Sequence, residues 1–429
     1  MAYHCAMHGT AEMIFTGDEL LRGDIVNSNQ AYLGERLLEV GLFATHALTV
    51  ADNLGSIVEA IKAALAREPD VLLISGGLGP TEDDLTREAV AQALGVALEH
   101  RRELLQQITA RFTFLSMNMP PSNRKQAALP VGAAALPFTG TAPGFWIEAG
   151  TTLIAALPGV SRELRTMWEE ELAPIVRSRL SIQTGNEGAG VIVRRLRVTG
   201  IGEGTLADAL KDLPWREQGV KFGTRAGLSG ITVILRGGPA KKARAGVLYL
   251  ESRVREILGD KVFGVDEADL AEALGQVLRQ HRLTVATAES CTGGLVAKRL
   301  TDIPGSSDYF VGGVVSYSNR LKTALLGVSE TLLATHGAVS EPVARAMAVG
   351  AVSRLGADCA IATTGIAGPN GGSPQKPVGL VYVATSVESE IEVARFTMFR
   401  DRDEIRERTA QTGLDLLRRR LLKRRPVDT

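Results

Sequence analysis

Three short apolar runs in this chain stop abruptly at glycine-rich turns, and this pattern limits the folds that the chain can adopt. Val71–Ser75 runs into GGLGP, Thr284–Ala288 into ESCTGG, and Cys359–Thr364 into GIAGPNGG. Continuous apolar runs of this length are typical of strands buried on both faces of a sheet, and ligands of such sheets bind at the carboxyl ends of the strands. The sequence therefore predicts an α/β protein with binding sites in these turns.

The 429 residues exceed what one hydrophobic core of ordinary size holds, and three regions differ in pattern. Residues 12–180 alternate strands with helices, which predicts a parallel sheet covered by helices. Residues 181–264 follow a β-α-β-β-α order, which predicts a small α+β domain. Residues 269–423 again alternate strands and helices, and their last helix is expected to open at Asp401, with Glu404 at capping-box spacing.

The composition argues against several classes of protein. The 48 basic and 48 acidic residues balance, so nothing in the net charge favours a nucleic acid or a membrane surface as partner. No apolar run approaches the roughly 20 residues that span a bilayer. Cys5, Cys291 and Cys359 are too few and too scattered for a disulfide framework or a zinc cage. We therefore expect a cytoplasmic location.

The turn after residues 284–288 carries the sharpest chemistry. Ser290 lies between a strand and a predicted helix, where a nucleophile faces the positive end of the helix and backbone N–H groups can hold an oxyanion. Gly293 and Gly294 let a substrate approach closely. A serine here is equally typical of a helix N-cap. Cys291 is a rival nucleophile, but neighbouring side chains point in different directions, and we favour Ser290.

Two further segments can complete a hydrolase site. Lys322 can accept the proton of a serine hydroxyl if burial lowers its pKa, and Tyr317 can relay a proton to a departing amine. Taken alone, each is more typically a solvated lysine or a core tyrosine. The loop Thr364–Gly372 follows a buried strand, and its backbone N–H groups suit a phosphate or a carboxylate, although it can also be a plain flexible loop.

These segments resemble the carboxyl-terminal domain of the CinA family from about Leu270 to Leu422, through the motifs AESCTGG, YSNRLK, THGAVS and TTGIAGPNGG. The resemblance implies an amidohydrolase without a cofactor, which converts nicotinamide mononucleotide (NMN) to nicotinate mononucleotide and ammonia through an acyl-enzyme. It implies that Ser290 is the nucleophile, Lys322 its base and Tyr317 a proton relay. It also implies substrate contacts from Gly293, Gly294, Asn319, Thr364, Gly365, Ala367, Gly368, Arg402 and Arg406.

In the first region, two turns combine glycines with acidic residues: TGDELLRG from Thr16 and GGLGPTEDDLT from Gly76. Glycines can cradle a diphosphate and carboxylates can hold Mg²⁺, although acids at helix starts also simply offset the helix dipole. Residues 12–172 resemble the molybdopterin-binding fold in the version that opens CinA proteins. This implies a metal-dependent ADP-ribose pyrophosphatase that uses Mg, Mn or Co. The implied metal ligands are Asp18, Asp83 and Asp84, and the implied substrate contacts are Gly76, Gly77, Gly79 and Thr81.

The middle region resembles the KH-type insert of long CinA proteins. Its glycine turn, Gly200–Gly204, contains Glu203, which argues against an RNA clamp and favours a linker or a dimerisation role. For the basic tail from Arg418 to Arg425, a solvated helix face is favoured over nucleic-acid binding. The resemblance implies a homodimer. The alternatives are a regulatory protein of competence or DNA damage, or a molybdopterin-binding protein, with one site inactive.

Overall fold

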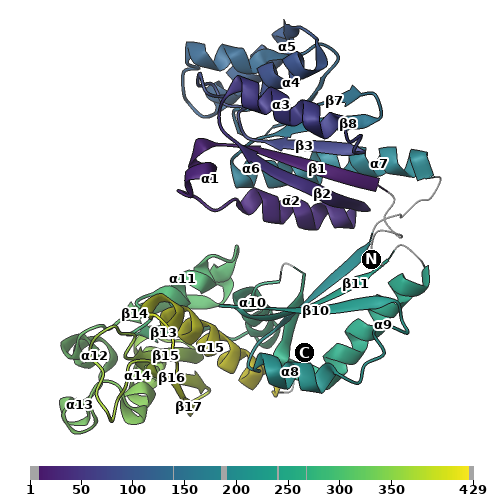
Figure 1. The fold of residues 1–429 in the computed structure, drawn as a ribbon. Coiled ribbons are helices and arrows are strands. Elements are labelled where there is room, and N and C mark those ends of the chain that lie inside the picture. The colour runs from purple at the N-terminus through teal and green to yellow at the C-terminus, as the bar shows by residue number, and fades with distance from the viewer. Residues whose placement is uncertain (1–8, 139, 185–190, 239–240, 267, 425–429) are drawn as a thin grey trace. The chain divides into compact units, whose positions relative to one another are not determined.

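The computed structural model describes residues 9–138, 140–184, 191–238, 241–266 and 268–424 (Figure 1). The chain divides into two compact units, made of residues 1–193 with 237–245 and of residues 194–236 with 246–429. The mixed α/β architecture that the sequence predicts is present in both.

A six-stranded sheet forms the centre of the first unit, with the strand order β2-β1-β3-β8-β7-β6. Its strands are β1 (Gly9–Thr16), β2 (Leu42–Val50), β3 (Val71–Ser75), β6 (Ala134–Leu136), β7 (Gly144–Ala149) and β8 (Thr152–Leu157). The first four in this order are parallel, as the sequence predicts, whereas β7 pairs antiparallel with both β8 and β6. The direction reverses because a tight turn at Gly150, with φ of +61°, joins β7 directly to β8.

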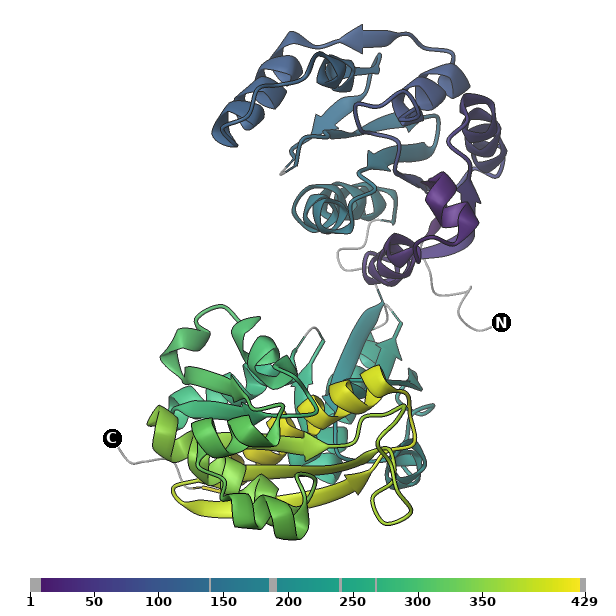
Figure 2. The same ribbon diagram turned by 90° about the vertical axis from the view of Figure 1, so that its left-hand side faces the viewer.

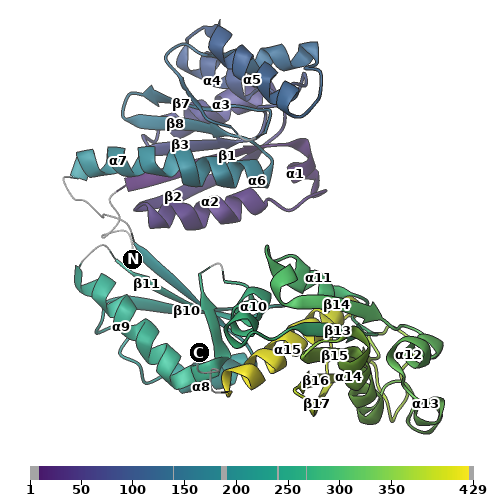
Figure 3. The same ribbon diagram turned by 180° about the vertical axis from the view of Figure 1, so that it is seen from behind.

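Helices cover both faces of this sheet (Figures 2 and 3). Alternate strand residues point to opposite faces: Ile14 and Ile74 pack under one group of helices, and Phe15 and Leu73 under the other. The first group is α3 (Leu54–Leu65), α4 (Thr86–Leu94) and α5 (Arg102–Phe114). The second group is α2 (Ser28–Glu39), α6 (Ser161–Met167) and α7 (Ala173–Thr184). The short α1 (Asp18–Arg22) and the pair β4 (Leu98–His100) and β5 (Ala128–Pro130) complete the unit.

The middle module has the β-α-β-β-α order that the sequence predicts, followed by one more strand. Its elements are β9 (Ile192–Val198), α8 (Glu203–Leu210), β10 (Val220–Gly227), β11 (Gly230–Gly237), α9 (Lys241–Leu258) and β12 (Val262–Val265). The strand order is β10-β11-β9-β12. The pattern of apolar residues predicts a helix over Ala240–Leu258, and Ala240 itself lies outside the described residues.

The carboxyl-terminal domain is built on a five-stranded sheet with the order β14-β13-β15-β16-β17. Its strands are β13 (Val285–Glu289), β14 (Phe310–Val315), β15 (Cys359–Gly365), β16 (Leu380–Val387) and β17 (Glu390–Thr397). The first three strands in the order are parallel, and β16 pairs antiparallel with both β15 and β17. The glycine-rich turns that follow β13 and β15 therefore emerge at the same edge of the sheet.

Helices also cover both faces of this second sheet. One face carries α10 (Leu270–His281), α11 (Leu295–Thr301) and α15 (Arg402–Leu422). The other carries α12 (Asn319–Leu326), α13 (Glu330–His336) and α14 (Glu341–Leu355). The Asp401 side chain accepts a hydrogen bond from Glu404 N (2.8 Å), which confirms the predicted cap of α15. The sequence does not reveal α12 and α13, which have 8 and 7 residues, because so few turns give little periodicity.

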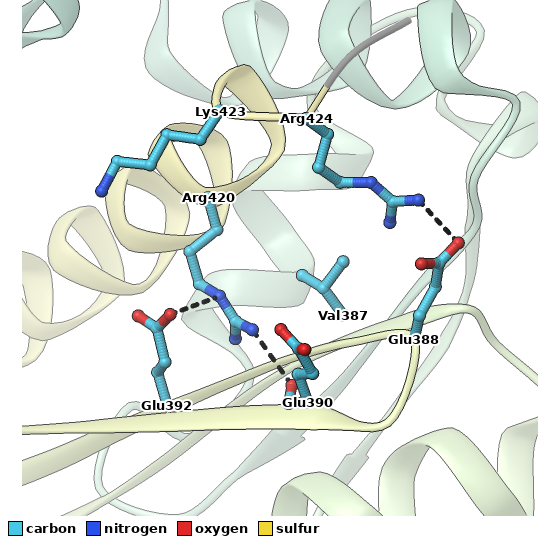
Figure 4. Close-up of a pocket in the computed structure, with 7 residues that line it drawn as sticks. All are labelled: Val387, Glu388, Glu390, Glu392, Arg420, Lys423 and Arg424. Carbon is cyan, nitrogen blue, oxygen red and sulfur yellow. Dashed lines mark hydrogen bonds and ion pairs between the residues drawn. The ribbon is translucent and has the colours of Figure 1, made fainter. Parts of the chain in front are cut away.

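The end of α15 is fastened to the hairpin between β16 and β17 (Figure 4). Glu388 and Ser389 in this turn have positive φ angles of 46° and 74°, which non-glycine residues rarely adopt. Arg424 pairs with Glu388 (2.6 Å), and Arg420 donates to Glu390 O (3.1 Å). Arg420 also binds Thr385 O (2.6 Å) and Glu392. These arginines hold the strained turn in place.

The expectation of a solvated basic face is therefore wrong for these arginines. Arg418 is 3 % exposed and pairs with Asp415 (2.8 Å), while Arg419 pairs with the other oxygen of Asp415 (3.0 Å). The physical reason is that this end of α15 packs against protein on several sides, so its basic residues meet carboxylates and carbonyls instead of water. Arg425 lies outside the described residues.

We expect Arg420→Met to lower the free energy of unfolding by about 2 kcal/mol, because the carbonyl and hydroxyl of the buried Thr385 lose a charged donor. Lys423→Met is the matched control, since Lys423 lies near Arg420 and its side chain makes no hydrogen bond or ion pair to any described residue. The control should change stability by less than about 0.5 kcal/mol. Urea unfolding of the three proteins measures the difference, and equal losses would show that Arg420 is not the fastening.

Candidate functional site

The three motifs of the carboxyl-terminal domain meet because their strands are parallel neighbours. β13 pairs with β14 and β15 on its two sides, and Glu289 lies opposite both Val315 and Thr363. The residues that follow these strands therefore leave the sheet together. Ser290 follows β13, the Tyr317–Lys322 segment follows β14, and the Thr364 loop ends β15.

Ser290 and Lys322 form a buried pair. Lys322 Nζ donates to Ser290 Oγ over 3.0 Å, and Lys322 is 1 % exposed. Its other contacts are two carbonyls, Ser316 O (2.7 Å) and Tyr317 O (3.4 Å). Burial lowers the pKa of Lys322, and no carboxylate pairs with it among the described residues. A lysine in such a place can lose its proton more readily and serve as a base for the serine.

Cys291 is a poor competitor for the role of nucleophile. Its thiol is buried, and burial raises its pKa to about 12. The thiolate is the nucleophilic form of cysteine, so this thiol stays inert near neutral pH. Chain neighbours thus differ in chemistry as the sequence predicts: Ser290 contacts the lysine, and Cys291 packs with Ala367, Val381 and Ile405.

Glu289 was not singled out by sequence reasoning, yet it shapes the turn around Ser290. Its side chain is fully buried and accepts hydrogen bonds from Gly294 N (2.9 Å), Val296 N (3.1 Å) and Ala297 N (2.9 Å). The N–H groups that open α11 are therefore already occupied. The oxyanion donors expected in this turn must therefore be other N–H groups, because the Glu289 carboxylate binds those that open α11.

Other N–H groups of the same turn remain open for that task. Ser290 N donates to Thr363 O (3.0 Å) and Gly293 N to Ser290 O (3.2 Å). The N–H groups of Cys291 and Thr292 have no oxygen acceptor in the part of the chain that the structure describes, and only the Cys291 sulfur, a weak acceptor, lies within their reach. They belong to the two residues that directly follow the nucleophile, so they are candidates to stabilise an oxyanion beside it.

Replacing Glu289 should destabilise the domain. We expect Glu289→Ala to lower the free energy of unfolding by about 3 kcal/mol or more, because three buried N–H groups lose their acceptor. Glu272→Ala is the control, since Glu272 is an exposed glutamate in the first turn of α10 and should cost less than about 0.5 kcal/mol. Chemical unfolding measures both, and a small effect of Glu289→Ala would contradict the role of this cap.

Tyr317 lies at the rim of the site. It is 61 % exposed, and its hydroxyl accepts a hydrogen bond from Arg402 Nη2 (3.1 Å). Only its carbonyl contacts Lys322. A proton relay through the hydroxyl stays a prediction, whereas the structure directly places Tyr317 beside Arg402, another residue expected from the sequence.

The two arginines at the start of α15 reach different parts of the site. Arg402 Nη1 donates to Gly368 O (2.6 Å), which connects it to the glycine loop after β15. Arg406 Nη2 donates to Thr292 O (3.0 Å), in the turn of the nucleophile. Thus α15 brings one arginine to each of the two loops, one helical turn apart.

The remaining predicted contacts lie around this centre. Asn319 is the first residue of α12 and is exposed, while Gly365 ends β15 and is followed by Ala367 and Gly368. The Thr364 hydroxyl donates to Ala338 O (2.8 Å), so it anchors its loop to the THGAVS segment. Gly293 and Gly294 have φ angles of +62° and +96°, which explains why glycine occupies both positions.

In the first unit, a cavity of about 670 Å³ opens at the carboxyl ends of the parallel strands. Its lining includes Gly76, Gly77, Gly79, Thr81, Asp83 and Asp84, all predicted from the sequence. Gly76 and Gly77 have φ angles of +108° and +64°. A Cβ at Gly76, Gly77 or Gly79 would lie 2.5 Å or less from Thr16 Oγ1, Thr86 Oγ1 or Asp84 Oδ2, respectively. The GGLG motif is thus required by the space around the loop.

The carbonyl groups of this loop point towards the protein. Thr86 supplies two donors, its hydroxyl to Gly76 O (2.7 Å) and its N–H to Gly77 O (3.1 Å). Gln126 Nε2 donates to Leu78 O (3.1 Å), and Lys125 Nζ donates to Thr81 O and Asp84 O. Thr86, Lys125 and Gln126 therefore hold the loop through its carbonyl groups, and none of the three was predicted from the sequence.

The acidic residues fit a metal only in part. Among the described residues, no three His, Cys, Asp or Glu side chains gather closely enough to enclose an ion. Asp18, Asp83 and Asp84 are thus not one cage: the Asp84 side chain accepts from Thr81 N (2.8 Å), whereas Asp18 lies beside Asp52. Asp52 was missed, although it follows the second parallel strand and so had to reach the same edge.

Asp18 and Asp52 exchange hydrogen bonds, from Asp18 N to Asp52 Oδ2 (3.0 Å) and from Asp52 N to Asp18 Oδ1 (3.2 Å). Burial raises the pKa of Asp52, and the charges of Glu19, Asp18 and Asp83 add to this, while the Asp18 N–H opposes it. A cation would relieve this repulsion. One or two carboxylates completed by phosphate oxygens form a common Mg²⁺ site, and the pair fits that pattern.

The glycine turn of the middle module is occupied by a side chain of the same unit. Arg419 Nη2 donates to Thr199 O (3.0 Å), and a Cβ at Gly200 would lie 2.2 Å from that nitrogen. The Glu203 side chain accepts from the Thr224 hydroxyl (2.9 Å). These contacts support the expectation that the turn is not an RNA clamp. No helix in the described ranges combines the length and the apolar character that crossing a bilayer requires.

Comparisons with known proteins agree along the whole chain. Three family descriptions match: "CinA C-terminal domain" at residues 267–421, "Probable molybdopterin binding domain" at 12–178, and "Damage-inducible protein CinA KH domain" at 193–264. A CinA-like protein of Microcystis aeruginosa is 43% identical over 420 residues, which cover 96% of this chain and 99% of that protein. One of Trichormus variabilis is 42% identical over 427 residues, 97% and 100% of the two chains.

A solved structure is similar to part of the chain. The competence/damage inducible protein CihA from Agrobacterium tumefaciens is 44% identical, and the match covers 36% of this chain and 94% of that one with a TM-score of 0.35. The full-length identity to the two CinA-like proteins is decisive, since it spans all three regions. The chain belongs to the CinA family.

Proposed function

We propose that the carboxyl-terminal domain is an amidohydrolase that converts NMN to nicotinate mononucleotide and ammonia. The observation that carries the proposal is the 3.0 Å hydrogen bond between Lys322 Nζ and Ser290 Oγ in a buried site. A serine needs a base to become a nucleophile, and the lowered pKa of Lys322 suits it to that task.

The reaction runs in two halves. Lys322 accepts the hydroxyl proton while Ser290 Oγ attacks the carboxamide carbon, and the carbonyl oxygen becomes an oxyanion near the N–H groups of Cys291 and Thr292. The protonated lysine returns its proton to the amide nitrogen, the C–N bond breaks, and ammonia leaves an ester on Ser290. Water, deprotonated by Lys322, hydrolyses the ester to the carboxylate and restores the serine.

The arginines at the rim suit the rest of the substrate. Arg402 and Arg406 add positive charge beside the glycine loop and the nucleophile turn, and NMN carries a phosphate. Guanidinium groups recognise phosphates through paired N–H donors. Of the two arginines, Arg402 is the preferred candidate for the phosphate ligand. Tyr317 lies next to it.

Ammonia release from NMN by the purified full chain is the direct test. Nicotinate mononucleotide must appear in equal amount, which separates amide hydrolysis from cleavage of the glycosidic bond. A chain that releases no ammonia from NMN would overturn the proposal. Nicotinamide without its ribose phosphate is the control substrate, because it lacks the group that the arginines would hold.

We propose a second activity for the first unit, the hydrolysis of ADP-ribose to AMP and ribose 5-phosphate. Its support is the cavity of about 670 Å³ between the glycine loop and the acidic residues. The loop would hold the diphosphate, while Asp18 and Asp52 would hold a divalent cation. When bound, such an ion neutralises phosphate charge and favours attack by water at phosphorus. Incubation with ADP-ribose and Mg, Mn or Co tests this, and no AMP with any metal would refute it.

Cytoplasmic location and a homodimer remain part of this proposal as predictions. A reducing compartment agrees with the buried free thiols of Cys291 and Cys359. Light scattering of the purified chain would determine the number of subunits.

A further inference from the structure

Arg87 is a buried cation that forms no ion pair with any described residue, although the charges of the nearby Glu88 and Asp84 act on it. It lies in the first turn of α4 and is fully buried. Its Nη1 donates to Leu78 O (2.7 Å) and its Nη2 to Gly79 O (2.8 Å), while Nε has no partner. No carboxylate of the described residues lies within ion-pair distance of it. Burying an unpaired charge costs several kcal/mol unless something balances it, so this arginine needs a reason to be there.

The position of Arg87 determines where the N–H groups of the loop point. In a trans peptide, the C=O and the following N–H point in opposite directions. The carbonyls of Gly77 and Leu78 are held on the side of α4, so the N–H groups of Leu78 and Gly79 point away from that helix. The same applies to Gly77 N, because Gly76 O is bound by the Thr86 hydroxyl.

These three N–H groups have no acceptor among the described residues, and the loop that carries them lines the cavity. Successive N–H groups that converge in this way form a cradle for an anion. The next residue, Pro80, has no N–H. The carbonyl of the peptide bond between Gly79 and Pro80, Gly79 O, accepts a hydrogen bond from Arg87. The guanidinium thus lies on the side of the loop that faces α4, and its positive charge attracts an anion that binds to the N–H groups on the cavity side.

We propose that Arg87 is a positioning residue of the first unit: it holds the loop with its N–H groups towards the cavity, and its unpaired charge is balanced by a phosphate group bound in front of the loop. The inference rests on the proposed function of this unit and deepens it, because it names the residue that prepares the diphosphate subsite. Burial lowers the pKa of Arg87, and the charges of Glu88 and Asp84 oppose this only in part.

Titration of the full chain with inorganic diphosphate, without added metal, tests the proposal. We expect Arg87→Met to weaken diphosphate binding by at least about tenfold, because both the fork and the charge are lost. Arg87→Lys keeps the charge but not the paired N–H donors of the guanidinium. Its affinity for diphosphate should therefore lie between those of the wild type and Arg87→Met, with the salt dependence of the wild type. Arg102→Met, which removes an exposed arginine of α5, should bind as the wild type does.

The outcomes separate the inference from the proposed activity. Wild-type affinity in Arg87→Met, an equal loss in Arg87→Lys and Arg87→Met, or no diphosphate binding by the wild type would each overturn the inference. Binding that depends on Arg87 in a chain that leaves ADP-ribose intact would support the inference and contradict only the pyrophosphatase activity. Ammonia release from NMN should be the same in all variants, since the altered residue belongs to the other unit.

Discussion

We expect the Ser290→Ala variant to release ammonia from NMN at least about 10⁴-fold more slowly than the wild type. The substitution removes the hydroxyl that Lys322 contacts and would activate for attack on the amide, while it leaves the glycine loop and both arginines in place. Substrate binding should therefore survive. A fall in kcat with an almost unchanged dissociation constant for NMN is the expected pattern.

The matched control is Cys291→Ala, which changes the neighbouring residue. Its thiol has a pKa of about 12 and lies among apolar side chains, so most of the activity should remain. Both variants are measured by ammonia release at saturating NMN. Full activity in Ser290→Ala, together with loss of activity in Cys291→Ala, would assign the nucleophile to the thiol and refute the serine mechanism.

The second large effect is expected at Lys322. Replacement by methionine, which has a similar shape and no amine, should lower kcat/KM by about 10²–10⁴-fold, the range for loss of a general base. Since the neutral amine is the active form, wild-type kcat/KM should rise with pH up to the lowered pKa of Lys322 and then level off. As the pH falls below that pKa, the amine is protonated and activity is lost.

The pH profile distinguishes a base from a merely structural lysine. If Lys322→Met keeps the pH dependence of the wild type at a reduced rate, then another group causes that dependence, and the assignment of Lys322 as base is wrong. Arg320→Met is the control, because Arg320 is an exposed neighbour on the same helix without a hydrogen bond to any described residue. Arg320→Met should leave both kcat and the pH dependence of kcat/KM unchanged.

Much of the architecture can be predicted from the sequence, since buried parallel strands leave a strong signal. Val71–Ser75 is found as a strand with the predicted bounds, and the glycine turns after β3, β13 and β15 open at strand ends as expected. Parallel neighbours bring such turns together whatever lies between them in the chain. Ser290 and Lys322, which the resemblance to the CinA family implies as nucleophile and base, are in contact in this arrangement.

The supporting residues could not be predicted in the same way. Glu289 and Arg87 each resemble an ordinary charged residue near a helix start, which is usually exposed. Their roles arise from burial against backbone groups, and a single sequence contains no sign of that burial. Asp52 differs, because its place after a parallel strand was visible and only its pairing with Asp18 was not.

Contacts at both ends of α15 constrain the number of residues in this helix. Its first turns present Arg402 and Arg406 to the loops around Ser290, and its last turns fasten Arg419 to the middle module and Arg420 to the β16–β17 hairpin. Inserting one residue between the two ends would rotate one set against the other by about 100° and shift it by about 1.5 Å. A loop of this domain can accept an insertion without such a rotation, whereas an insertion in α15 would break the contacts at one of its ends.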